Sequence, residues 1–309
     1  MNIEKIHKYT IYTLLFLLSS ISIFTNCYAK ENENSLIKSN DNNTNNIFQA
    51  IFDSLKIKNT DTNFIKKYQN DTSLKFNERY IKINVTGYLK PTDYSFLYAN
   101  KSIEQSKDFL KKHLSILTEA EKKYKVPKEI IVAILKIETR FGEVLGNNHL
   151  PSVFFSTALV NQQKYIDINC KVIDDLPDTL NNKNELKEKI LQRSKRKSNW
   201  AINELIAISK IENKYGIDFN KINGSWAGAF GLPQFLPSSY LRSAVDGNND
   251  GKIDLFDLED AIFSVGNYLS KHKFDTFANK KKAVYSYNNS NDYAEAVIKL
   301  SEKLIEKKK

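Results

Sequence analysis

Residues 246–257 read Asp-Gly-Asn-Asn-Asp-Gly-Lys-Ile-Asp-Leu-Phe-Asp and carry oxygen-bearing side chains at loop positions 1, 3, 5, 9 and 12. Gly251 at position 6 permits a sharp turn, and the Lys252 carbonyl at position 7 can serve as a ligand. This is the spacing of a helix-flanked calcium loop, and hard oxygen ligands favour calcium over softer metals. The predicted calcium ligands are Asp246, Asn248, Asp250, Lys252 through its carbonyl, and Asp257. An Asn/Asp-rich surface turn without an ion is the alternative.

The last position of this loop indicates what the ion would do. Asp257 stands where such loops usually carry Glu, and its shorter side chain turns in less readily for bidentate ligation. The sequence carries one such loop, whereas calcium sensors usually carry paired loops. We therefore expect a structural calcium ion that braces another site in the chain.

The composition is that of a globular protein with an anionic partner. The 309 residues are 41% hydrophobic and carry a net charge of +10. Nucleic acid, acidic lipid and an acidic wall polymer all match this charge. Because no nucleic-acid-binding motif is present and the basic residues mostly mix with Glu as on solvated helix faces, we expect no nucleic-acid partner.

The N-terminus has the pattern of an export signal. Lys5 and Lys8 precede an uncharged apolar run, and Cys27-Tyr28-Ala29 offers small residues before Lys30. We interpret residues 1–29 as a cleaved signal peptide of a periplasmic or secreted protein. A retained transmembrane anchor is the alternative, which the Ser, Thr and Asn content of the run disfavours.

The two cysteines have little structural use in this interpretation. Lipid attachment at Cys27 stays open but is disfavoured, because Phe24-Thr25-Asn26 is a poor match to the small residues that precede a lipidated cysteine. Cleavage after Ala29 would leave Cys170 alone, so no internal disulfide could form.

The remaining chain is predicted to be mainly α. Residues 30–75 are interpreted as a largely disordered tether, with a short helix around 47–57, because residues 30–46 are rich in Asn, Asp and Ser. The domain proper would span 76–309. Ser102 and Gln105 form a capping box, and a further helix starts at Pro127 and is closed by Gly142. Other helices are predicted at 199–214, 258–271 and 292–306, and a weak strand at 81–85.

One carboxyl group stands out on an apolar helix face. Glu138 follows Ile131 by seven residues and Ile134 by four, so it falls on their buried stripe. Loss of hydration there raises the pKa of a carboxyl group toward the range of a general acid at neutral pH. A structural Glu paired with Arg140 or a helix end is the alternative.

Four motifs in order resemble the membrane-bound lytic murein transglycosylase B family of peptidoglycan-cleaving enzymes. They are Ile137-Glu138-Thr139-Arg140-Phe141-Gly142, the run from Gly224 to Tyr240 (GSWAGAFGLPQFLPSSY), the calcium-like loop, and Tyr285-Ser286-Tyr287-Asn288 with Tyr293. The resemblance covers roughly residues 100–300. It implies a lysozyme-like, largely helical fold with minor short β elements, which binds a glycan strand in a groove.

The resemblance implies that Glu138 is the single catalytic acid and base. It would protonate the bond between N-acetylmuramic acid and N-acetylglucosamine, and then deprotonate the muramoyl 6-hydroxyl as that oxygen attacks C1. The product would be a 1,6-anhydro end, formed without water. A muramidase that uses the same Glu138 with water, and a silent wall-binding protein, are the alternatives. The expected partner is the peptidoglycan strand, bound by a monomer, and association with the envelope is a further expectation.

The resemblance also implies a set of substrate-binding residues, each with a structural alternative. Ser225 and Gln234 would hydrogen-bond the acid and the sugars, or only close a tightly packed turn. Core packing is the rival role for Tyr268 and Tyr293. Asn288 could orient Glu138 and stabilise developing charge. The predicted substrate-binding residues are Ser225, Gln234, Tyr268, Tyr287, Asn288 and Tyr293.

One segment departs from the family pattern. Residues 156–198 are longer and more basic than the corresponding family segment, and a Tyr-Pro-Arg-Arg-like stretch is absent. The aromatic contacts to the glycan that this stretch provides have no match here, so the sequence leaves the stem-peptide preference open.

Overall fold

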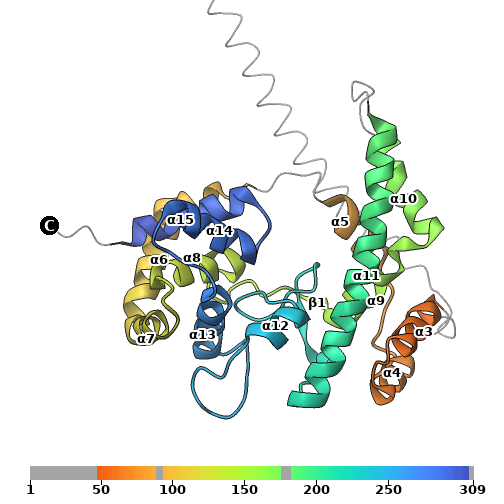
Figure 1. Ribbon diagram of the computed structural model, residues 1–309, viewed down its shortest axis with the longest axis horizontal. Helices are drawn as coiled ribbons and strands as arrows, with labels where there is room; N and C mark the ends of the chain where they lie inside the picture. The colour runs from red at the N-terminus through yellow and green to blue at the C-terminus, as the bar shows by residue number, and fades with distance from the viewer. Residues whose placement is uncertain (1–46, 88–92, 175–181, 306–309) are drawn as a thin grey trace, which may run out of the picture. The chain divides into compact units, whose positions relative to one another are not determined.

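The computed structural model describes residues 47–87, 93–174 and 182–305, and these are mainly helical (Figure 1). A short antiparallel pair, β1 (Asn148–His149) with β2 (Asn223–Gly224), is the sheet of the described residues. The α-helices are α3 (Gln49–Ile57), α4 (Thr62–Gln69), α5 (Glu78–Thr86), α6 (Asn100–Lys112), α7 (Leu114–Tyr124), α8 (Lys128–Thr139), α9 (Leu150–Ala158), α10 (Gln163–Asp174), α11 (Lys183–Tyr215), α12 (Pro237–Ser243), α13 (Leu258–Leu269), α14 (Phe277–Tyr287) and α15 (Asn291–Leu304). The prediction of a mainly α fold is confirmed.

Two hydrophobic clusters form the core. The first gathers apolar side chains of α3, α4, α5, α9 and α11, and the second those of α7, α8, α13 and α15. Figure 1 shows the same division, with α8 grouped with α6 and α15, and α9 lying along α11. Tyr268 and Tyr287 pack against both clusters and so mark their boundary.

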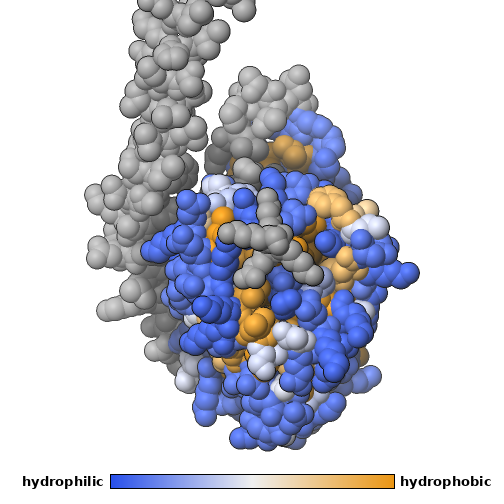
Figure 2. All heavy atoms as spheres, turned by 90° about the vertical axis from the view of Figure 1, so that its left-hand side faces the viewer, coloured by the Kyte–Doolittle hydropathy of each residue, from blue (hydrophilic) through white to orange (hydrophobic). Residues whose placement is uncertain are grey.

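The outer face of the second cluster is polar. Figure 2 shows a mainly hydrophilic surface on which hydrophobic residues appear in places between hydrophilic ones. Such a surface is expected where amphipathic helices bury one stripe each. None of the helices in the described residues combines the length and the apolar character needed to cross a bilayer.

The predicted tether over residues 30–75 is wrong from residue 47 onward. The short helix expected near 47–57 is present as α3, and α4 follows it with Asp61 as its N-cap. Phe52, Leu55 and Tyr68 from these helices are buried in the first cluster, so the polar composition of the flanking residues concealed an apolar face. Residues 1–46, with the predicted signal peptide and the start of the tether, lie outside the described residues.

The strand predicted at 81–85 is wrong as well, because these residues lie within α5. The sequence Ile-Lys-Ile-Asn-Val alternates as a strand would, but Ile81 and Val85 are also four residues apart and bury the same helix face. Packing of α5 against α9 and α11 decides in favour of the helix.

Two predicted helix ends are also corrected. The structure starts α6 at Asn100 with Ala99 as the N-cap, so Ser102 is an interior residue and no capping box forms. Helix α8 ends at Thr139, before Gly142, because Arg140 and Phe141 already have left-handed φ angles of 52° and 65°. The helices predicted at 258–271 and 292–306 are confirmed as α13 and α15 within a few residues.

Candidate active site

Glu138 lies at the C-terminal end of α8, one turn beyond a stretch that is buried on all sides. The side chains from Ile130 to Leu135 have no more than 1% of their surface exposed, which fixes the helix in the second cluster. Glu138 itself is partly exposed as a residue, while its carboxyl group is surrounded by protein atoms. Burial raises the pKa of Glu138 to about 7, and the hydrogen bond from Tyr293 opposes this shift.

Tyr293 contacts this carboxyl group directly. Helix α15 begins after Ser290, whose hydroxyl oxygen accepts from the Tyr293 backbone N–H, and the phenol is buried beside α8. The Tyr293 hydroxyl donates to Glu138 Oε1 over 2.6 Å. The pKa of Tyr293 is well above its usual value because of burial and the nearby Glu138 charge, so the phenol stays a donor.

A second ring holds Tyr293 in place. Tyr94 meets the Tyr293 ring edge-on, with 6.1 Å between the ring centroids. Tyr94 could not be selected from the sequence, because it precedes the short 3₁₀ turn Ser95–Tyr98 and no periodic pattern singles it out.

Tyr287 and Tyr268 form an aromatic layer next to the acid. Their ring centroids are 4.9 Å apart. The Tyr287 hydroxyl donates to the Pro233 carbonyl over 2.5 Å, and the Tyr268 hydroxyl donates to the Ser286 carbonyl over 2.7 Å. Burial raises the pKa of Tyr287 far above its usual value, and the Glu138 charge adds to this shift. Both tyrosines therefore pack against the core, and Tyr287 lies close enough to Glu138 to interact with its charge.

The loop from Gly231 to Phe235 connects α8 to this layer. Thr139, next to Glu138, donates from its hydroxyl to the Leu232 carbonyl over 3.0 Å. Gln234 has a left-handed φ of 51°, and its side-chain amide donates to the carbonyls of Gly231 and Leu145. Left-handed backbone at a residue other than glycine is strained and concentrates at functional sites. The Oε1 atom of Gln234 makes no hydrogen bond to a described residue.

Ser225 closes the turn before this loop. Its hydroxyl oxygen accepts from the Ala229 backbone N–H over 3.1 Å, while its own N–H donates to the Ala229 carbonyl. The turn lies directly on α9, because a Cβ on Gly228 would fall 2.2 Å from the Phe154 ring. Gly228 also has a φ of 84°. Both the lack of space for a Cβ and this left-handed backbone therefore require glycine at this position.

The structure bears differently on two sequence predictions about Glu138. The alternative of a structural ion pair with Arg140 is wrong, since the Arg140 guanidinium lies 5.8 Å from the centroid of the Phe96 ring and forms no ion pair with Glu138. Asn288 is exposed at the end of α14, and its side chain makes no hydrogen bond to any described residue. Its role toward Glu138 stays a prediction.

The loop at 246–257 is built by hydrogen bonds from its side chains to its own backbone. Asp246 Oδ2 accepts from Gly251 N–H over 2.8 Å, and Asn248 and Asp250 accept from backbone N–H groups two residues on. These three residues carry oxygen donors of the kind that a hard cation prefers. Asp257 has another role, because its Oδ1 caps α13 through the N–H groups of Glu259 and Asp260.

The fit of the loop to calcium is therefore partial. No group of three or more His, Cys, Asp or Glu side chains within residues 47–87, 93–174 and 182–305 is arranged to hold a metal ion. The buried Asp260, which the sequence analysis did not select, holds the loop ends together by accepting from Gly247 N–H over 2.7 Å and Asp254 N–H over 2.6 Å.

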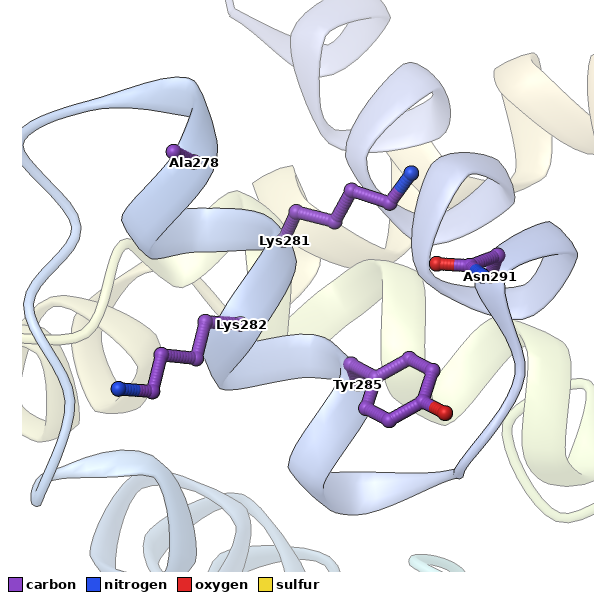
Figure 3. Close-up of a pocket in the computed structure, with 5 residues that line it drawn as sticks. All are labelled: Ala278, Lys281, Lys282, Tyr285 and Asn291. Atoms are coloured by element: carbon purple, nitrogen blue, oxygen red, sulfur yellow. The ribbon is translucent and has the colours of Figure 1, made fainter.

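A shallow cavity of about 360 Å³ opens on the outer side of α14 (Figure 3). It is lined by Ala278, Lys281, Lys282, Tyr285 and Asn291. Lys281 extends toward the start of α15, where it pairs with Glu295 over 2.7 Å. None of the predicted site residues lines this cavity, so it is separate from the Glu138 site.

Comparisons with known proteins agree with this fold. Among curated proteins, membrane-bound lytic murein transglycosylase B of Escherichia coli (strain K12) is 31% identical over 164 residues. The matched segment is 53% of this chain and 36% of the relative, so the chain spans only about a third of that protein.

Solved structures share the fold at low identity. The calcium complex of the Escherichia coli lytic transglycosylase SLT35 has a TM-score of 0.63 and 20% identity, covering 84% of this chain and 92% of that one. Soluble lytic transglycosylase SltB1 of Pseudomonas aeruginosa has a TM-score of 0.61 and 19% identity, covering 84% and 98%. SltB3 of the same organism, in complex with NAG-anhNAM-pentapeptide, has a TM-score of 0.60 and 18% identity, covering 83% and 78%.

The family assignment follows from a longer match. The family model described as the transglycosylase SLT domain matches residues 38–280, which is well over half of the 309 residues. The chain belongs to the transglycosylase SLT domain family.

Proposed function

We propose that this chain is a lytic transglycosylase that cleaves the β-1,4 bond between N-acetylmuramic acid and N-acetylglucosamine in peptidoglycan. The observation that carries the proposal is the Glu138 carboxyl group, whose pKa is raised to about 7 and whose Oε1 accepts from Tyr293. A carboxyl group with this pKa is divided between its acid and base forms at neutral pH. One residue can therefore serve in both roles.

In the first step Glu138 acts as an acid. Its proton passes to the glycosidic oxygen, and the bond from muramoyl C1 to that oxygen breaks. The carboxylate that remains accepts the Tyr293 hydroxyl hydrogen bond, which stabilises the charge formed in this step.

In the second step the same carboxylate acts as a base. It takes the proton of the muramoyl 6-hydroxyl while that oxygen bonds to C1, so a 1,6-anhydro ring forms and the acid is regenerated. No water is consumed. An ordinary glycosidase would need a second carboxylate within about 5–10 Å. Among the described residues, no carboxylate contributes to the pKa of Glu138.

The relatives support the same reaction class. Membrane-bound lytic murein transglycosylase B carries the activity in its name, and SltB3 was solved with NAG-anhNAM-pentapeptide, a fragment that contains an anhydro sugar. SltB3 was also solved with NAG-NAM-pentapeptide. We therefore propose that glycan strands are also the substrate class of this chain.

Product analysis of digested peptidoglycan tests the proposal. Mass spectrometry of the released muropeptides should show 1,6-anhydromuramic ends that are absent after mock digestion. Reducing ends would instead identify a muramidase that uses Glu138 with water. Absence of cleavage by the folded protein would leave a wall-binding protein that keeps the family fold.

We further propose that the 246–257 loop binds a structural calcium ion. Asp246, Asn248 and Asp250 would supply side-chain oxygens, Lys252 its carbonyl and Asp257 a carboxylate. The support is the position of the first three residues and the calcium complex of SLT35, which shares the fold. The ion would neutralise the loop carboxylates and so stabilise the segment that joins α12 to α13.

We also propose that the chain acts as a monomer outside the cytoplasm. The support for export is the basic and apolar N-terminal pattern of residues 1–29, and the relative named as membrane-bound is an envelope protein. The net charge of +10 favours binding to the carboxylates of the wall polymer.

A further inference from the structure

Helix α11 carries a stripe of charged and aromatic side chains that the reaction at Glu138 does not use. Arg193, Lys197, Trp200 and Glu204 follow one another at spacings of four, three and four residues, which places them on one helix face. Lys197 and Trp200 are both partly buried. The stripe lies in and beyond the basic segment that departs from the family pattern.

The aromatic member of the stripe is held rigidly. The Trp200 ring meets the Phe154 ring edge-on at 5.7 Å between centroids, and Phe154 lies under the turn at Gly228. The Trp200 indole also hydrogen-bonds the buried Glu204 carboxylate, which accepts from the Ser238 N–H and hydroxyl over 2.8 and 2.7 Å. Glu204 is thus already satisfied by neighbours on α11 and α12.

One cation of the stripe, Lys197, forms no ion pair. The Lys197 ammonium lies 4.0 Å from the centroid of the Trp200 ring, and within residues 182–305 and the other described ranges no carboxylate forms an ion pair with it. Burial, with Arg193 next in importance, lowers the pKa of Lys197 to about 8, and the charge of Glu204 opposes this shift. A partly buried ammonium without an ion pair is stabilised when an anion binds to it.

A continuous series of contacts leads from this lysine to the catalytic carboxyl group. Glu204 interacts with the Arg242 charge, and the Arg242 guanidinium lies 5.5 Å from the centroid of the Tyr268 ring. Tyr268 packs on Tyr287, whose pKa responds to the Glu138 charge. The stripe and the acid are therefore linked through a chain of contacts between polar and aromatic side chains.

We propose that Lys197, seated on Trp200, binds a carboxylate of the peptide stems carried by the glycan strand. The proposal rests on the proposed function, because it assumes that a peptide-bearing glycan occupies the Glu138 site. A peptide stem is the anionic part of such a strand, and an ammonium with no ion pair beside a rigid aromatic ring offers it a charged contact and an apolar one.

The test compares variants on two matched substrates. Lys197→Met keeps the length and packing of the side chain and removes the charge, whereas Lys197→Arg keeps the charge. Lys195→Met removes an exposed charge two positions away, on another side of α11, and serves as the control. The substrates are peptide-bearing strands and the same strands with their peptide carboxylates converted to amides.

The expected result is a change in KM for one variant, Lys197→Met, on one substrate, the carboxylate-bearing strands. Lys197→Met should raise KM about tenfold for the carboxylate-bearing strands, the effect of losing one charged hydrogen bond. Its KM for the amidated strands should equal that of the wild type, and Lys197→Arg should restore most of the difference. Lys195→Met should match the wild type on both substrates.

Two results would overturn the proposal. Equal KM values for wild type and Lys197→Met on both substrates would show that Lys197 does not contact a stem carboxylate. An equal loss on both substrates would give Lys197 a purely structural role, and a lowered melting temperature would show the same. Failure of the wild type to release anhydro ends from either substrate would instead refute the proposed function, so the two failures are distinguishable.

Discussion

The Tyr293 hydroxyl donates to Glu138 Oε1 across 2.6 Å, so a residue on the last helix sets the proton affinity of a carboxyl group 155 residues earlier in the chain. Burial raises the pKa of Glu138, and this hydrogen bond lowers it. The balance gives a pKa of about 7, where the carboxyl group can both donate and accept a proton.

Glu138→Gln should fold and bind glycan but lose nearly all activity. The amide keeps the shape of the side chain and has no proton to exchange, and general acid–base catalysis contributes roughly a hundred- to ten-thousandfold. Muropeptide release and pull-down with insoluble peptidoglycan measure the two properties. Turnover close to wild type in the folded variant would remove Glu138 from the mechanism.

Tyr293→Phe should shift the pH dependence of cleavage to higher pH. Removing the donor abolishes a contact that lowers the pKa of Glu138, so the carboxyl group keeps its proton further into the alkaline range. The alkaline limb of the profile should move upward, and the maximal rate should fall because the developing carboxylate loses a donor. An unchanged alkaline limb at a lowered rate would mean that Tyr293 only packs.

The stability of the fold should depend on pH through Glu138. The pKa of this group is about 7 in the folded state and 4.5 in its ordinary state, so the folded chain binds the proton more tightly. Its contribution to stability is present at low pH and is lost as the pH rises through this range. Glu138→Gln should therefore melt at a higher temperature than the wild type at pH 8 and show a smaller difference at pH 5. A constant difference across this range would contradict the assignment.

Calcium should raise the melting temperature, because a ligand that binds only the folded chain stabilises it by mass action. Asp246→Ala should abolish the response, since Asp246 supplies an oxygen of the loop. A calorimetric scan with calcium and with a chelator measures the effect, and Asp275→Ala, an exposed acid outside the loop, is the matched control. If wild-type protein shown to be free of bound ions has the same melting temperature with calcium and with chelator, the loop is a turn that binds no ion.

Substrate with an acetylated muramoyl 6-hydroxyl should resist cleavage, because the proposed nucleophile is blocked. Orientation of this hydroxyl supplies much of the rate in an intramolecular attack. Chromatography of digests of acetylated and deacetylated strands measures the difference. Efficient release of reducing ends from acetylated strands would show that water attacks.

The sequence predicted the site better than the segments around it. Glu138 could be found from its place on an apolar stripe, since the helix period decides burial directly. Tyr293, Tyr287 and Gln234 were reached through the family motifs, but their contacts depend on how α15, α14 and the 231–235 loop meet α8. Such contacts join residues far apart in sequence, and no local pattern encodes them.

The misassigned segments have related physical causes. Residues 81–85 satisfy the strand and the helix period together, so only packing on α9 separates the two. The polar residues around α3 and α4 masked an apolar face that is visible only against α9. Asp260 and Tyr94 went unselected because their contacts depend on how separate segments meet in the fold, which no local pattern encodes.

Tyr268 and Tyr287 pack against both hydrophobic clusters, and this has a consequence for the proton affinity of Glu138. In a chain with only one cluster formed, these tyrosines would lack part of their packing, and the Glu138 carboxyl group would be more hydrated, with a pKa closer to its ordinary value. The raised pKa of Glu138 is thus a property of the completed fold, in which both clusters meet at Tyr268 and Tyr287.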